Sequence, residues 1–251
     1  MFIHPDDHPA KIANTAHHLF SLPSNDMFAD RMTQYLCSTC RRNFIPVESP
    51  VCSGCGVMFK SRTGSDHYCG ECITSPKKFK SAKSFGLYDH ALMTVIHCLK
   101  YKTKVELAHP LGMLLFSVFI RFWHQGKIDY IVPVPLYPKK QRERGFNQSF
   151  LLIKDWQKWA DLLPVSISVC TENNLLKRNR RTKPQTALKR KERLTNIKGA
   201  FTVSDTLKVK NKNILVVDDV YTTGATVNEC ATVLLRAGAN YVDVLTLARA
   251  M

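Results

Sequence analysis

Residues 214–226 read Ile-Leu-Val-Val-Asp-Asp-Val-Tyr-Thr-Thr-Gly-Ala-Thr, and this stretch decides the fold. Its first four residues are apolar and mostly β-branched, which predicts a strand buried on both faces, as in a parallel sheet. Two acids stand where this strand is expected to end, and a hydroxyl-rich turn leads into a helix from about Val227. The N–H groups at the start of a helix bind phosphate, and paired carboxylates suit ribose hydroxyls, directly or through Mg²⁺. The stretch therefore predicts a site for a phosphorylated ribose.

Strand-like and helix-like segments alternate through residues 79–251. The predicted strands lie near 84–88, 128–134, 165–169, 199–203, 213–217 and 241–247, and the predicted helices near 91–101, 107–123, 146–162 and 227–237. This alternation predicts a parallel α/β sheet with helices on both faces, in which ligands bind at the carboxyl ends of the strands. The polar, basic stretch 75–80 marks the junction with a smaller module of residues 35–78. Residues 1–34 show little periodicity and are interpreted as a poorly specified leader.

Cysteines define the smaller module. Three Cys-x-x-Cys pairs lie within residues 37–72, namely Cys37/Cys40, Cys52/Cys55 and Cys69/Cys72. Two such pairs complete a tetrahedral zinc site of four thiolates, and clustered thiols in a reducing compartment favour metal over disulfides. Cys52, Cys55, Cys69 and Cys72 are predicted to hold a structural zinc, with Cys37 and Cys40 as candidates for a second site. These two are either the remnant of that site or recruit another ligand such as His67. Whether the module only stabilises a small fold or also binds nucleic acid or protein stays open.

The charge of the chain points to polyanionic partners. The net charge is +16 over 251 residues, and two segments concentrate it. Residues 139–144 hold four bases and one acid, which on charge alone indicates a solvated loop. Residues 171–198 hold ten bases and two acids, which predicts a mobile loop over the cleft that closes on phosphates and contacts nucleic acid regardless of base sequence. The candidate pyrophosphate and DNA contacts are Lys139, Lys140, Arg142, Arg144, Arg178, Arg180, Arg181 and Lys183.

Neither a membrane span nor an export signal is expected from the sequence. No apolar run approaches the roughly 20 residues that span a bilayer, so no membrane insertion is expected. The first residues include Asp6, Asp7 and several histidines and lack the apolar core of a signal peptide. A cytoplasmic location is expected on these grounds.

The 214–226 stretch resembles the phosphoribosyl-pyrophosphate (PRPP) binding motif of type I phosphoribosyltransferases, in which an apolar run, two acids and two spacers precede Thr-Thr-Gly-x-Thr. The resemblance implies that Asp218 and Asp219 hold the ribose hydroxyls and magnesium. It also implies that the turn holds the 5′-phosphate, through Thr222, Thr223, Gly224, Ala225 and Thr226.

A wider set of motifs resembles the ComF family, whose ComFC-like group is linked to competence and DNA uptake. The match covers about residues 37–251, and its most specific string is Arg144-Gly145-Phe146-Asn147-Gln148 within 132–148. The other matching segments are the cysteine ribbon and residues 99–102, 106–108, 178–185, 196–201 and 214–226. The resemblance implies a type I phosphoribosyltransferase-like sheet preceded by a zinc ribbon. It also implies that residues 139–144 form a pyrophosphate-binding loop and not merely a solvated one. It further implies binding of PRPP with magnesium and of single-stranded DNA, a role accessory to natural transformation, and DNA-uptake proteins as partners.

This chain departs from the family pattern in two places, and two alternative functions stay open. The family often has eight ribbon cysteines where this chain has six, and it commonly has His where Tyr137 stands. The first alternative is an active phosphoribosyltransferase on an unidentified acceptor, for which no segment predicts a base-binding hood and no catalytic residue is assigned. The second is a PRPP-sensing regulator with a protein partner.

Overall fold

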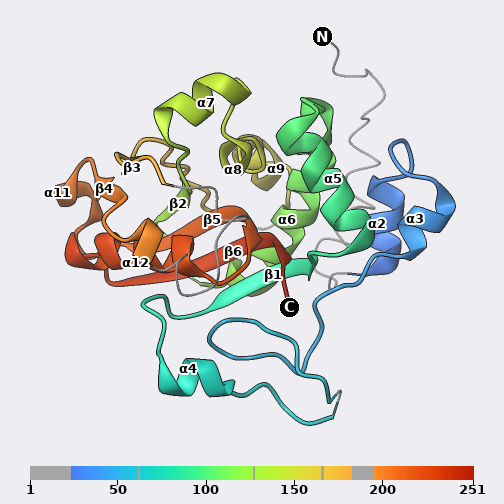
Figure 1. The fold of residues 1–251 in the computed structure, drawn as a ribbon, viewed down its shortest axis with the longest axis horizontal. Helices are drawn as coiled ribbons and strands as arrows, with labels where there is room; N and C mark the ends of the chain where they lie inside the picture. The colour runs from blue at the N-terminus through green and yellow to red at the C-terminus, as the bar shows by residue number, and fades with distance from the viewer. Residues whose placement is uncertain (1–23, 62, 127, 165–166, 183–194) are drawn as a thin grey trace.

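The architecture is a parallel sheet with helices on both faces (Figure 1). The computed structural model describes residues 24–61, 63–126, 128–164, 167–182 and 195–251. Four strands pair in the order β1-β6-β5-β2, and every pairing is parallel. Their bounds are β1 Ala82–Leu87, β2 Tyr130–Pro133, β5 Asn213–Tyr221 and β6 Tyr241–Arg249. The predicted fold class is confirmed, and the carboxyl ends of all four strands meet at one edge.

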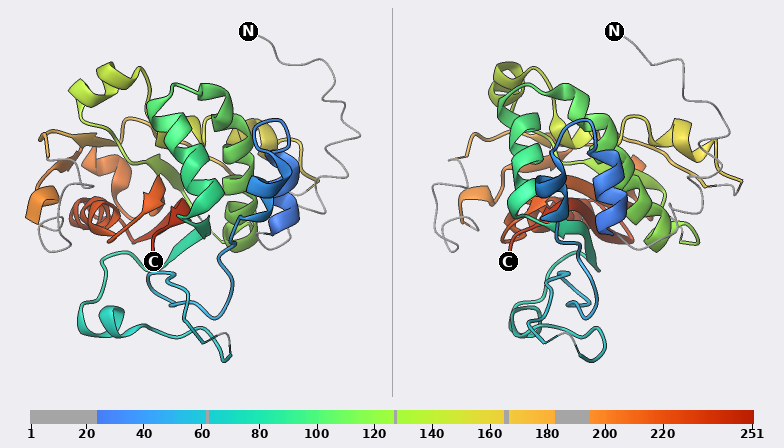
Figure 2. Two further views of the ribbon diagram at one scale, coloured as in Figure 1. Left: turned by 45° about the vertical axis from the view of Figure 1, so that its right-hand side comes forward. Right: turned by 90° about the vertical axis from the view of Figure 1, so that its right-hand side faces the viewer.

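The central strand β5 is buried on both faces, as its apolar run predicts. Leu215 and Val217 belong to one apolar cluster, together with helix α6 (Ala108–Trp123). Ile214 and Val216 belong to the opposite cluster, together with α12 (Ala225–Arg236). Side chains alternate between the faces of a strand, so an unbroken apolar run fills both cores. Figure 2 shows these two helices on opposite sides of the sheet.

The amino-terminal segment joins this core. Helix α2 (Asn25–Arg31) buries Phe28 completely, and α3 (Ser38–Arg42) follows it. The Phe28 ring stacks on Phe44 with a centroid separation of 4.3 Å, and Phe44 stacks on Phe85 of β1 at 4.9 Å. Part of the segment interpreted as a poorly specified leader is therefore a helix packed on the sheet. A helix of two turns is too short to leave a periodic pattern in the sequence.

Several predicted elements differ from the observed ones. Residues 139–144 form helix α7 (Pro138–Arg144) instead of a loop, because proline fits the first turn of a helix and Gly145 ends it at a φ of 83°. The predicted helix 146–162 is two short helices, α8 (Gln148–Leu151) and α9 (Trp156–Ala160).

Two predicted sheet strands also differ from the structure. The predicted strand 199–203 is β4 (Phe201–Val203), which pairs antiparallel with β3 (Leu176–Arg178) in a separate two-stranded sheet. The predicted strand 165–169 begins at residues 165–166, outside the described residues, and residues 167–169 are not a strand. In this region only Thr171 bridges to Ile131.

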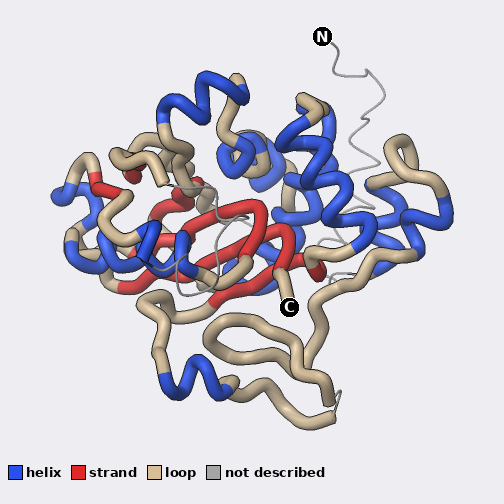
Figure 3. The backbone as a smooth tube through the Cα atoms, viewed as in Figure 1, coloured by secondary structure: helices blue, strands red, loops and turns tan. Residues whose placement is uncertain are grey.

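The remaining elements connect these parts. Helix α5 (His90–Tyr101) and the 3₁₀ turn η1 (Val105–Leu107) precede α6, and α11 (Thr206–Val209) precedes β5. Residues 46–81, called the ribbon lobe from here on, are mostly loop and contain the helix α4 (Gly70–Thr74) (Figure 3). The lobe is fastened to the sheet by backbone hydrogen bonds from the Ala82 N–H to the Gly54 carbonyl at 2.8 Å and from the Lys80 N–H to the Val242 carbonyl at 2.7 Å.

The helix predicted near 107–123 is present, and together with η1 it forms one long apolar segment. Val105–Trp123 is 19 residues long with a mean hydropathy of 1.5, which meets the length and composition of a membrane span. Within the fold, 67% of this segment is buried, and it packs against β1 and β6. A helix buried in a protein core can have the same length and hydropathy as a membrane span.

Candidate functional site

The acid pair lies at the carboxyl edge of the sheet, near the end of β5. The Asp218 side chain accepts hydrogen bonds from the Ser149 hydroxyl at 2.9 Å and from the Asp219 N–H at 2.9 Å. The Oδ2 atom of Asp219 forms an ion pair with the Lys100 ammonium. Both acids are buried, with exposed fractions of 8% and 3%. Carboxylate oxygens are hard donors of the kind that suits Mg²⁺.

The hydroxyl-rich turn follows directly and opens helix α12. Gly224 occupies the N-cap position with a φ of 74°, a conformation that side chains other than glycine rarely adopt. Its backbone rests on the phenol of Tyr221, since a Cβ added at Gly224 would lie 2.2 Å from the Tyr221 hydroxyl oxygen. The turn is thereby held at the start of a twelve-residue helix, where the helix dipole favours an anion.

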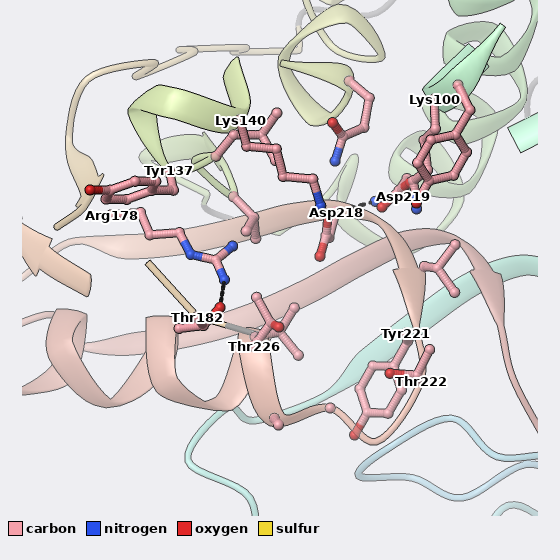
Figure 4. Close-up of a pocket in the computed structure, with 18 of the residues that line it drawn as sticks. Lys100, Tyr137, Lys140, Arg178, Thr182, Asp218, Asp219, Tyr221, Thr222 and Thr226 are labelled. Carbon is pink, nitrogen blue, oxygen red and sulfur yellow. Dashed lines mark hydrogen bonds and ion pairs between the residues drawn. The ribbon is translucent and has the colours of Figure 1, made fainter. Parts of the chain in front are cut away.

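A single cavity of about 420 Å³ joins the acids and the turn to basic side chains (Figure 4). Its size falls in the range of roughly 300–1,000 Å³ typical of small-molecule sites. The predicted site residues that line it are Lys139, Lys140, Arg178, Arg181, Asp218, Asp219, Thr222, Gly224, Ala225 and Thr226. These come from α7, from the β3 segment and from the β5–α12 stretch. Figure 4 shows Lys140 reaching toward Asp218, and the Arg178 guanidinium in the same cavity donating to the Thr182 hydroxyl.

The other predicted cations lie differently. Arg180 donates to the backbone carbonyls of Asn196 and Lys198 at 2.8 Å, so it closes the base of its own loop. Arg144 hydrogen-bonds Gln148 and lies 5.3 Å from the ring centroid of Tyr101. Arg142, Arg144, Arg180 and Thr223 do not line the cavity, and Lys183 lies outside the described residues.

Electrostatic coupling ties these groups together. Burial raises the pKa of Asp218, while Lys100, the Ser149 hydroxyl, Arg178 and Lys140 act in the opposite direction. Burial lowers the pKa of Lys100 to about 8; Asp218 opposes this shift, and Arg144 adds to it. The pKa of Lys140 is lowered by partial burial and by its cationic neighbours. Cations crowded around two buried acids are a local excess of positive charge, which a polyphosphate would neutralise.

The second centre is in the ribbon lobe. The Sγ atoms of Cys52, Cys55, Cys69 and Cys72 lie within 4.8 Å of one another, and those of Cys55 and Cys69 are 3.8 Å apart. A tetrahedral zinc with Zn–S bonds of about 2.3 Å requires sulfur atoms about 3.8 Å apart. The Cys52 sulfur accepts N–H groups from Cys55 at 3.4 Å and Cys69 at 3.3 Å. Although burial opposes it, these and other backbone donors lower the pKa of Cys52 to about 6, which favours the thiolate that binds metal.

The first cysteine pair stands apart from this centre. Cys37 caps helix α3 and Cys40 lies within it, and both side chains are exposed. His67, the alternative ligand considered from the sequence, stacks on Phe59 with a centroid distance of 3.9 Å. Within the described ranges, the four cysteines of the ribbon lobe form the one group of three or more metal-ligating side chains that come together.

Comparison with known proteins agrees with both centres. A double zinc ribbon domain model matches residues 29–73, and a phosphoribosyl transferase domain model matches residues 169–251. Competence protein F of Haemophilus influenzae is 31% identical over 230 residues, covering 86% of this chain and 97% of that protein. The chain belongs to the ComF family. The ComF resemblance is thereby confirmed, and the zinc ribbon match together with the four-cysteine cluster supports a structural zinc.

Further ComF relatives extend this comparison. The DNA utilization protein YhgH of Escherichia coli K12 is 32% identical over 219 residues, covering 86% of this chain and 91% of that protein. Competence protein ComFC of Bacillus subtilis is 26% identical over 233 residues, covering 89% and 88%. Among solved structures, a hypoxanthine phosphoribosyltransferase from Staphylococcus aureus aligns over 62% of this chain and 64% of its own. The sequence identity is 15% and the TM-score is 0.30.

Sequence reasoning missed three residues of this ComF-family site. Lys100 stands in a motif string that the sequence analysis quoted, yet only the structure brings its ammonium to Asp219. Ser149 follows the Arg144–Gln148 string and donates to Asp218. Arg249, at the end of β6, lies between Tyr221 and the cysteine cluster. None of the three had a local signal beyond membership in, or proximity to, a motif.

Proposed function

We propose that this ComF-family protein binds PRPP with magnesium at the carboxyl edge of its sheet and single-stranded DNA on the adjoining basic surface, as a cytoplasmic accessory to DNA uptake. One observation carries the first part. Two buried acids, a glycine turn at a helix N-terminus and cations from two other segments line one cavity. The names of the relatives, competence protein F and DNA utilization protein, support the second part.

The residue roles follow from this geometry. Asp218 and Asp219 would hold the ribose hydroxyls and the magnesium, because they present carboxylate oxygens at the floor of the cavity. The turn 222–226 would take the 5′-phosphate through its N–H and hydroxyl groups. Lys139, Lys140, Arg178 and Arg181 would face the pyrophosphate, which they would attract and orient by charge. Magnesium held by Asp218 and Asp219 would neutralise part of the pyrophosphate charge.

Ligand-induced stabilisation tests the PRPP site. Magnesium with PRPP should raise the melting temperature of the wild-type protein, because a ligand that binds only the folded state stabilises it by linkage. The double variant Asp218→Asn, Asp219→Asn should fold and should show no shift. Ribose 5-phosphate, which lacks the pyrophosphate, is the matched control ligand and should shift wild type much less. An equal PRPP shift in wild type and double variant would contradict the assignment.

Single-stranded DNA binding is supported by an exposed aromatic beside the cations. Tyr101 lines the cavity, is 56% exposed, and lies against His97 at 4.5 Å and beneath Arg144. Bases stack on such rings, at about 1–3 kcal/mol each, while cations contact the phosphates. Residues 171–198 themselves contain no aromatic side chain on which a base could stack. At the cavity, Tyr101 combines an exposed ring with neighbouring positive charge.

Fluorescence anisotropy with a labelled oligonucleotide tests this second site. Affinity should be largely independent of base sequence and should fall with salt, with a log–log slope of about −0.7 per phosphate contacted. Tyr101→Leu should weaken binding roughly 5- to 150-fold, the equivalent of one lost stacking contact of about 1–3 kcal/mol, whereas Tyr101→Phe should bind as wild type. Undetectable binding at about 0.1 M salt would refute the DNA part of the proposal.

The alternative is turnover of PRPP by an active phosphoribosyltransferase, which the match of the phosphoribosyl transferase domain model favours. The same residues would then act by positioning and charge, since departure of pyrophosphate leaves positive charge on the ribose and negative charge on the leaving group. Release of pyrophosphate that depends on a candidate acceptor, and is abolished in the acid double variant, would favour this alternative. A PRPP-sensing regulator would instead bind PRPP without pyrophosphate release and without DNA.

A further inference from the structure

The cysteine cluster and the phosphate turn are joined by a short stack of buried side chains. The Arg249 guanidinium donates from Nη2 to the Cys55 sulfur at 3.3 Å. Its central carbon lies 4.1 Å from the ring centroid of Tyr221. The Tyr221 hydroxyl in turn underlies Gly224 in the turn. Two side chains therefore separate a metal ligand from the predicted phosphate site.

Charge and burial explain why arginine stands in this position. Arg249 is 6% exposed, and among the described residues its Nε and Nη1 have no hydrogen-bond partner. A buried guanidinium is costly unless a negative charge accompanies it. Four thiolates around one Zn²⁺ carry a net charge of −2, and Arg249 is the cation hydrogen-bonded to one of them. Its planar group also stacks on an aromatic face, which a lysine ammonium does not reproduce.

The stack has little freedom to rearrange. The rings of Phe79 and Tyr221 pack edge to face with a centroid distance of 6.2 Å. The Arg249 backbone is fixed in the sheet, where its carbonyl accepts the Tyr88 N–H at 2.7 Å. Cys52, Cys55, Cys72, Tyr221 and Ala225 belong to one continuous apolar cluster. A shift of the cysteine cluster would therefore be transmitted to the turn, because close-packed side chains do not absorb displacement.

We propose that Arg249 is a positioning residue that couples the zinc centre to the turn 222–226. Through this coupling, zinc would strengthen the binding of PRPP, and PRPP would strengthen the binding of zinc. This inference rests on the proposed PRPP site. Its physical basis is a second-shell hydrogen bond to a metal ligand, whose loss typically costs about 10- to 100-fold in metal affinity. Because coupling between two binding sites is reciprocal, PRPP must raise zinc affinity by the factor by which zinc raises PRPP affinity.

The test measures zinc affinity of the full-length protein by competition with a zinc-selective chelator, with and without magnesium and PRPP. In wild type, magnesium with PRPP should raise zinc affinity about fivefold or more, the lower end of typical couplings. Arg249→Met, similar in length but uncharged, should lose about 10- to 100-fold in zinc affinity and should show no PRPP effect. The exposed Arg236 of α12 provides the matched control, and Arg236→Met should behave as wild type.

A second readout separates this inference from the PRPP proposal. Amide hydrogen exchange of zinc-loaded protein without PRPP should be faster in Arg249→Met over residues 222–226, by about tenfold or more, as expected for loss of one charge-assisted hydrogen bond. If wild type binds no PRPP but this acceleration occurs, the PRPP proposal fails and the coupling of centre to turn stands. Wild-type zinc affinity together with wild-type exchange in Arg249→Met would overturn the inference. If Arg249→Met does not fold, Arg249→Lys, which keeps the charge, takes its place. Arg249→Lys should fold and retain zinc, but its amides at residues 222–226 should exchange faster than those of wild type. Wild-type exchange rates in Arg249→Lys would overturn the inference.

Discussion

Replacement of Gly224 by alanine probes the geometry of the phosphate turn. Gly224 has a φ of 74°, and this left-handed conformation costs a residue with a Cβ roughly 1–2 kcal/mol. The new Cβ would also lie 2.2 Å from the Tyr221 hydroxyl oxygen and 2.4 Å from its Cζ. Tyr221 is confined by Arg249 and Phe79, so overpacking adds about 1–3 kcal/mol. We expect the free energy of unfolding to fall by roughly 2–5 kcal/mol in total.

Urea denaturation of zinc-loaded protein measures this loss, and Gly238→Ala is the matched control. Gly238 also has a positive φ, of 95°, but an added Cβ would meet its nearest neighbour at 3.6 Å, an ordinary contact. Gly238→Ala should therefore lose only the backbone cost of roughly 1–2 kcal/mol. Gly224→Ala should in addition weaken PRPP binding, whereas Gly238→Ala should not. Equal destabilisation of the two variants would refute the close packing of the turn on Tyr221.

Three further predictions concern other parts of the molecule. Purified protein should hold about one zinc per chain by atomic absorption, and Cys72→Ser should lose it while Cys37→Ser keeps it; two zinc ions per chain would contradict this pairing. The pKa of Lys100 is lowered to about 8 in the folded state from 10.5 in the unfolded state, so between these pH values the unfolded chain binds more protons and stability rises with pH. Lys100→Met should remove this rise, on the order of 1–3 kcal/mol in urea titrations at pH 7.5 and 10, and an unchanged pH dependence would refute it. The buried Asp243 accepts from the Trp123 indole N–H at 2.9 Å, so Trp123→Phe should cost about 1–3 kcal/mol and Phe122→Leu, at the exposed neighbouring position, much less.

The sequence predicts the central part of the fold because the decisive signals are local. The run Ile214–Val217 predicts a strand buried on both faces, and the structure confirms it. The strand continues to Tyr221, past its predicted end, because Asp218 and Tyr221 still pair with Thr246 and Arg249 of β6. That continuation depends on a partner strand, which local hydrophobicity does not encode. Helix α7 had local signals in Pro138 and Gly145, but its charge density favoured a loop.

The site contacts that the sequence did not predict are long-range. Lys100 and Asp219 are 119 positions apart, and Cys55 and Arg249 are 194 apart. Each of these residues satisfies its own local pattern, as a helix position, a strand position or part of a cysteine turn. Which charge meets which acid is set by the order of strands in the sheet. The acids, the turn and the cysteine pairs were predictable because each motif is contiguous, whereas the residues that orient them are dispersed.

The ribbon lobe and the sheet domain are separate in composition but continuous in packing. A junction of polar, basic residues divides them in the sequence, yet Cys52, Cys55 and Cys72 belong to the same apolar cluster as Ile214 and Val216 of β5. A short lobe with little core of its own gains its stability from the metal and from this shared surface. Metal binding that orders the lobe would therefore also order the residues that pack behind the turn 222–226. This continuity favours a structural contribution of zinc to the proposed PRPP site.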